Sequence, residues 1–225
     1  MCPETSARSG QPLHYLIALG LAAFWFLALA CFSADFLRGY FPLGDEFALL
    51  ANSYPGLGQP LHWLTEGFSR YFIAFPELTV PSTNFIRPVF NLTYWLVGWF
   101  VSPTSGVFLY VNLAVLAACS GLMFLALRRS VPVLFALLLA AVLPLAPAFL
   151  PSVGVLLVPC QAFDPMAVFW CLLAYLAYRD SRLWLCTVWL ILAVFTKETA
   201  LPVAAALCVA YVLEHRHYFL RRERL

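Results

Sequence analysis

The sequence predicts an all-α integral membrane protein, with about six transmembrane segments and two amphipathic interfacial helices between the first and second spans. Composition predicts the membrane class: of 225 residues, 63% are hydrophobic and 11% are charged, with a mean hydropathy of +0.86. Soluble domains have about 45–50% apolar and about 25% charged residues. Apolar runs of span length recur along the chain, so we expect residues 1–225 to form a single membrane domain.

The apolar runs divide into six candidate spans. A helix needs about 20 apolar residues to cross the hydrocarbon core. Three runs have this length: 13–33, 106–127 and 132–150. Residues 165–178 form a shorter run, and the run 183–213 is interrupted at Lys197-Glu198. Because basic residues flank both ends of the interrupted run, we expect the chain to enter the membrane there and return to the same side.

The cations are distributed unevenly over this six-segment arrangement, with nine on one face and four on the other. The nine are Arg8, Arg128, Arg129, Arg179, Arg182, Arg216, Arg221, Arg222 and Arg224, and the four are Arg38, Arg70, Arg87 and Lys197. An excess of Lys and Arg marks the cytoplasmic side. Both termini, including the basic tail 215–225, are therefore predicted to be cytoplasmic.

Residues 34–105 would be an unusually long loop if they had no secondary structure. Apolar residues recur at helical spacing in two of its segments, 61–72 and 89–100, and polar residues occupy the other side. Helices of this length reach about 20 Å, less than the hydrocarbon thickness of about 30 Å. The pattern predicts two helices lying flat on the outer surface.

Asp45 and Glu46 form the first candidate site, shortly after the first span. Adjacent carboxylates repel, so the pair suits general-base catalysis or coordination of a divalent metal. The alternative is structural, because acidic residues before Phe47 would stabilise a helix N-terminus.

Asn84 and Arg87 form the second candidate site, in the segment that ends at Pro88. Proline favours the first helical position, so the second surface helix should begin there with Arg87 beside its N-terminus. A guanidinium next to free backbone N–H groups favours phosphate binding. The alternative is an arginine that extends toward the lipid headgroups.

Asp164, Lys197 and Glu198 form the third candidate site, at similar depth in the membrane. Lys197 lies about 21 Å from the level of Arg182, in the outer third of the hydrocarbon. Ionisable residues at that depth usually face a bundle interior or a water-filled cavity. The alternatives are an N-cap at Asp164, before Pro165, and a structural Lys197–Glu198 ion pair that closes a helix hairpin.

Cysteine and histidine give no sign of a cofactor. The seven cysteines lie mostly in apolar runs without a CxxC pair, which indicates neither a disulfide framework nor a zinc site. The four histidines are scattered. The basic tail is typical of a topology signal that contacts membrane lipids, and nothing indicates binding of nucleic acid.

These features together resemble the N-terminal membrane module of the C-type glycosyltransferase superfamily, GT-C, in particular protein O-mannosyltransferases and bacterial aminoarabinose transferase-like proteins. The resemblance rests on the order of motifs over nearly the whole chain, because no single motif is specific. In order these are Asp45-Glu46, Arg87-Pro88, Ser102 to Gly106 leading to Asn112, Ala162 to Pro165, and Phe195 to Pro202 with its Lys197-Glu198 pair.

The resemblance implies transfer of a sugar from a polyprenyl-phosphate-linked donor to an acceptor on the outer face, in the bacterial inner membrane with a periplasmic active face. It implies that Asp45 serves the acceptor or acts as base, with Glu46 as its companion. From charge alone, we expect Arg87 and Lys197 to stabilise the departing phosphate.

The chain departs from the family because the family's enzymes usually continue through more spans. We therefore expect a partial chain, a partner that completes the site, or a module with another role. A competing hypothesis is therefore a noncatalytic integral subunit that keeps a GT-C-like fold and packs against a membrane-protein partner in a larger complex. A small transporter is disfavoured because the sequence has no inverted internal repeat.

Overall fold

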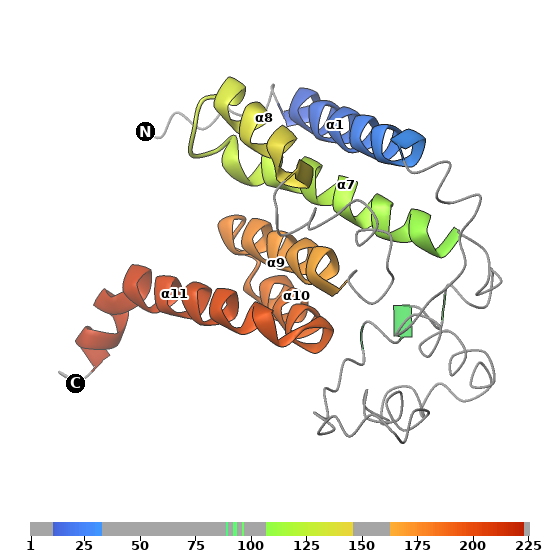
Figure 1. Ribbon diagram of the computed structural model, residues 1–225. Helices are drawn as coiled ribbons and strands as arrows, with labels where there is room; N and C mark the ends of the chain where they lie inside the picture. The colour runs from blue at the N-terminus through green and yellow to red at the C-terminus, as the bar shows by residue number, and fades with distance from the viewer. Residues whose placement is uncertain are drawn as a thin grey trace, which may run out of the picture.

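The computed structural model shows an all-helical protein (Figure 1). The structure describes residues 11–32, 89, 92, 93, 96, 107–145 and 163–222. Its helices are α1 (Gln11–Phe32), α7 (Val107–Leu127), α8 (Val133–Val142), η1 (Leu143–Leu145), α9 (Phe163–Arg179), α10 (Leu183–Thr196), η3 (Glu198–Ala200) and α11 (Leu201–Arg222). No strand occurs in these ranges, which confirms the all-α prediction.

Within the described ranges, three stretches are long and apolar enough to cross a membrane: Pro12–Phe32, Tyr110–Leu127 and Glu198–His215. The first two match predicted long runs. In the third predicted run, 132–150, the described helices end at Leu145, and residues 146–150 lie outside the described part. The third long stretch is instead the second half of the interrupted run. Helices α8, α9 and α10 are apolar but shorter, so the number of six spans stays a prediction.

Helix α7 lies at the centre of the bundle and packs against α1, α8 and α9. Its apolar side chains Leu113, Leu116 and Phe124 are almost completely buried. Ser120 is also fully buried, and its hydroxyl donates a 2.5 Å hydrogen bond to the Ala140 carbonyl of α8. The bond satisfies a hydroxyl that would otherwise be costly to bury.

The contact between α1 and α7 depends on a glycine. A Cβ added at Gly121 would lie 2.6 Å from the Ala18 carbonyl oxygen and 3.5 Å from the Ala22 Cβ of α1. The two backbones therefore approach each other more closely than a side chain at position 121 would allow. Close approach at small residues is how membrane helices gain packing contacts, because lipid provides no hydrophobic force between them.

Helices α9 and α10 form a hairpin, joined by Asp180–Arg182. The Arg182 N–H donates to the Ala177 carbonyl and the Ser181 N–H to the Tyr178 carbonyl, both at 2.9 Å. This pair of bonds is the Schellman motif, which requires a left-handed residue after the helix. Ser181 takes that conformation with φ of 57°, although glycine would adopt it with less strain.

Small residues line the interface within this hairpin: Ala174, Ala177, Cys186 and Ala193 are buried. Beside them Trp170 of α9 stacks on Trp189 of α10, with ring centroids 5.3 Å apart and an interplanar angle of 13°. The small residues bring the helices together, and the stacked indoles fill the wider part of the interface.

The interrupted run breaks where the sequence predicts. Helix α10 ends at Thr196, Lys197 is extended with φ of −157° and ψ of 136°, and η3 leads into α11. Pro202 explains the break, because its ring would clash with the Glu198 carbonyl in a continuous helix and it has no N–H to donate.

Helix α11 then returns along the hairpin to the end at which α10 begins. The Tyr178 hydroxyl, in the last turn of α9, donates a 2.7 Å hydrogen bond to the Glu214 carboxylate of α11. The described ends of the interrupted run therefore lie at the same end of the bundle, whereas their position on one side of a membrane stays a prediction. In Figure 1 the late part of α11 lies on the left, as does the end of α9.

Most of the segment 34–105 lies outside the described residues. Val89, Leu92, Thr93 and Leu96 are helical, and the Thr93 hydroxyl donates to the Val89 carbonyl at 2.9 Å. These residues belong to the second predicted surface helix. Its position at an interface, and the first surface helix over 61–72, stay predictions.

Candidate functional site

The seven predicted site residues divide into two groups. Four lie outside the described residues: Asp45, Glu46, Asn84 and Arg87. The other three, Asp164, Lys197 and Glu198, belong to the helices α9 to α11. The structure therefore gives positions only for residues of the third candidate site.

Lys197 and Glu198 lie at the break between α10 and α11. The Lys197 N–H donates to the Ala193 carbonyl at 3.0 Å, and its carbonyl accepts from the Ala200 N–H at 3.1 Å. Both bonds fix the backbone across the break. The Lys197 side chain is half-buried and that of Glu198 is exposed. The break therefore presents two ionisable side chains at one level, beside the fully buried Thr196.

Asp164 lies in the first turn of α9, directly before Pro165. The helix begins at Phe163, and the alternative that Asp164 caps it stays a prediction. An acidic residue in the first turn complements the helix dipole, and proline is tolerated there because the first N–H groups have no partner within the helix.

The hairpin brings the start of α9 to the end of α10. The turn at Asp180–Arg182 makes the two helices antiparallel, and η3 packs against α9. Asp164 lies 15 residues before Arg179, and Lys197 lies 14 residues after Leu183. At 1.5 Å per residue both backbones are about 21–23 Å from the turn. The backbones of Asp164 and Lys197 thus lie toward the same end of the bundle, and their joint role as a site stays a prediction.

A contact with α7 holds the start of α9 in place. The buried Cys119 thiol donates to the Pro165 carbonyl, with 3.3 Å between sulfur and oxygen. Asn112, also buried, lies nearly two turns closer to the N-terminus of α7. The N-terminal halves of α7 and α9 lie at the same end of the bundle. The buried Asn112 amide is therefore at the end that also carries Asp164 and Lys197.

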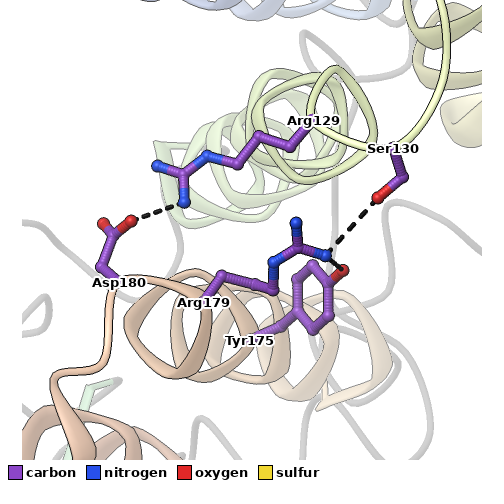
Figure 2. Close-up of polar contacts among 5 residues, drawn as sticks. All are labelled: Arg129, Ser130, Tyr175, Arg179 and Asp180. Atoms are coloured by element: carbon purple, nitrogen blue, oxygen red, sulfur yellow. Dashed lines mark hydrogen bonds and ion pairs between the residues drawn. The ribbon is translucent and has the colours of Figure 1, made fainter. Parts of the chain in front are cut away.

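The opposite end of the bundle is basic (Figure 2). Arg129, after α7, forms a 2.5 Å ion pair with Asp180, after α9. Arg179 donates to the Tyr175 hydroxyl at 3.1 Å and to the Ser130 hydroxyl at 3.5 Å. These contacts join the loop after α7 to the turn after α9, so the two loops lie at one level.

A further contact adds the N-terminus of α1 to this basic end. The Arg128 guanidinium is 2.9 Å from Nδ1 of His14. Together with Arg182 in the hairpin turn, four of the nine cations predicted to share a face lie at one end: Arg128, Arg129, Arg179 and Arg182. Lys197, predicted for the other face, lies at the other end. The contacts of Asp180 and Glu214 were not predicted, because no sequence spacing links them to Arg129 or Tyr178.

The described ranges hold no cluster of three or more His, Cys, Asp or Glu residues with metal-site geometry. The predicted acidic pair, Asp45 and Glu46, is outside those ranges. The described end carries the Lys197 ammonium and the Glu198 carboxylate at the helix break. An ammonium can bind phosphate, and a carboxylate can exchange protons.

Comparison of the chain with protein-family models, with curated proteins and with solved structures found no match.

Proposed function

We propose that this chain is a GT-C-like glycosyltransferase module that transfers a sugar from a polyprenyl-phosphate-linked donor to an acceptor on the membrane face opposite its basic end. The observation that supports the proposal most directly is the helix break at Lys197-Glu198, set at the same end as Asp164. The order of motifs along the sequence supports it further.

Each ionisable residue has a proposed role. The Asp45 carboxylate accepts the proton from the acceptor as the sugar transfers, with Glu46 beside it. Asn84 and Arg87 bind the donor phosphate. The Lys197 ammonium stabilises the charge that grows on the phosphate as the glycosidic bond breaks, and such stabilisation lowers the barrier because the charge is greatest in the transition state. Asp164 and Glu198 orient the cation and the sugar.

The direct test is sugar transfer by the purified full chain in lipid vesicles. Polyprenyl-phosphate carrying radiolabelled mannose or aminoarabinose is the donor, and a total membrane extract supplies acceptors. Asp45→Asn should lower the rate by at least about 100-fold, the lower end of what a general base contributes. Asp35→Asn is the matched control, because it removes another carboxylate from the same segment, and it should keep the wild-type rate.

Two results would overturn the proposal: no transfer by a well-folded wild type with either donor, or equal rates for Asp45→Asn and Asp35→Asn. A pronounced loss in Lys197→Gln with partial recovery in Lys197→Arg would support the role of the cation, since arginine keeps the charge but not its shape.

The alternative function, a noncatalytic subunit of a larger membrane complex, is favoured by one observation. In the stretch Glu198–His215 only 6% of the residues are buried within the chain, so most of the apolar surface of α11 is open to lipid or to another helix. For this alternative we expect an inactive wild type whose residues on α11, such as Val209, form cross-links to a partner helix in native membranes.

A further inference from the structure

A groove of about 390 Å³ lies between α10 and α11. Its walls are largely apolar, with Leu183 and Leu190 of α10 facing Leu207 and Val212 of α11. The groove follows about two turns of α10, from Leu183 to Leu190, which corresponds to about 10 Å along the helix. It is therefore an open apolar groove along this part of the helices.

Two of the hydroxyl groups that line the groove already donate hydrogen bonds within the chain. The Thr187 hydroxyl donates to the Leu183 carbonyl at 3.0 Å, and the Tyr178 hydroxyl donates to the Glu214 carboxylate at 2.7 Å. A polar ligand would lose its own hydrogen bonds to water without gaining these donors. The groove therefore favours a flexible hydrocarbon chain.

One end of the groove opens at the basic end of the bundle. Tyr178 and Leu183, which line it, stand on either side of the hairpin turn. Arg182 lies in that turn, directly before α10, and its side chain is exposed. Within the part of the chain that the structure describes, Arg182 forms no ion pair.

The charges near this opening favour an anion. Asp180 is paired with Arg129, whereas the Glu214 carboxylate accepts the Tyr178 hydroxyl and keeps its negative charge. Arg179 likewise donates its hydrogen bonds to hydroxyl groups, so its positive charge is not neutralised by them. Arg182 and Arg179 together outnumber Glu214 and thus leave net positive charge beside the end of the groove.

We propose that this groove is a binding site for an anionic phospholipid, with part of one acyl chain between α10 and α11 and the phosphate against Arg182. Basic pockets between membrane helices bind anionic headgroups in this way. The site lies at the opposite end of the bundle from Lys197 and does not depend on sugar transfer.

The test is native mass spectrometry of the full chain in detergent, after delipidation. The probe is an equal mixture of phosphatidylglycerol and phosphatidylcholine with identical acyl chains. We expect phosphatidylglycerol adducts to dominate at one bound lipid. Arg182→Gln should reduce the ratio of the two adducts about fivefold, the effect of one arginine at a headgroup, whereas Arg182→Lys should keep it.

A second pair of variants tests the groove itself. Cys208 lines it, and Cys208→Trp should fill it and abolish the first adduct. Cys31→Trp is the matched control, because Cys31 is an exposed cysteine on α1, and it should bind as the wild type does. Equal adducts of the two lipids in the wild type would overturn the proposal. Unchanged lipid binding in Cys208→Trp would also overturn it. The same holds for a wild-type dimer without bound lipid that becomes a monomer in Cys208→Trp, because a second chain would then occupy the groove.

Discussion

Helices α7 and α11 both contain a stretch long enough to span a membrane, yet the bundle uses them differently. Half of Tyr110–Leu127 is buried within the chain, but only 6% of Glu198–His215. Helix α7 is in contact with α1, α8 and α9, whereas α11 lies along one edge of the α9–α10 hairpin. Length and hydropathy therefore indicate that a helix can span a membrane, but they do not predict whether its surface contacts protein or lipid.

The largest expected effect compares the same substitution in the two helices. Leu116 of α7 is 1% exposed and Leu213 of α11 is 59% exposed. Leu116→Ala should lower the free energy of unfolding by about 2–5 kcal/mol, because it leaves a cavity in the core. Leu213→Ala should change it by less than about 0.5 kcal/mol, because lipid fills the space.

Unfolding by sodium dodecyl sulfate in mixed micelles, followed by circular dichroism, measures both variants. If the two leucine variants lowered the free energy of unfolding equally, the difference in burial between α7 and α11 would not determine how much each helix contributes to stability.

A second prediction concerns why α7 is buried. Gly121→Ala places a methyl group 2.6 Å from the Ala18 carbonyl, so α1 must move away. We expect a loss of about 1–3 kcal/mol in the free energy of unfolding, the usual cost of overpacking.

Gly20→Ala is the matched control, because an added Cβ there meets nothing within 4 Å. It should be neutral or stabilise α1 slightly, since alanine has the higher helix propensity. Equal destabilisation by both alanines would mean that backbone flexibility, not the close approach of α1 to α7, accounts for the glycine. The same detergent titration separates these outcomes.

The smallest effect on the free energy of unfolding is expected at Ser181, in the turn between α9 and α10. Ser181→Gly should raise the free energy of unfolding by up to about 1 kcal/mol, because glycine adopts the left-handed conformation without strain. Ser181→Ala keeps the strain and should give no gain. A loss of stability in Ser181→Gly would show that the serine hydroxyl, rather than the backbone, matters in this turn.

Much of the helical framework can be predicted from the sequence. Helices α1 and α7 coincide with predicted runs, and the break at Lys197-Glu198 follows from the position of Pro202. The change from α-helix to a 3-10 turn at Leu143–Leu145 was not predicted, because hydropathy does not distinguish the two kinds of helix. Of the candidate site, the shared level of Asp164 and Lys197 could be predicted, since it follows from counting residues along two antiparallel helices.

The sequence by itself determined that the described chain is helical and apolar, and where the helix α10 ends. These properties depend on side-chain type and spacing, which are local. Only the tertiary structure decided that Gly121 meets Ala18, that Arg129 pairs with Asp180, and that α10 and α11 enclose an apolar groove. The reason is that these contacts join residues of separate helices, and the packing of small side chains sets which helix faces meet.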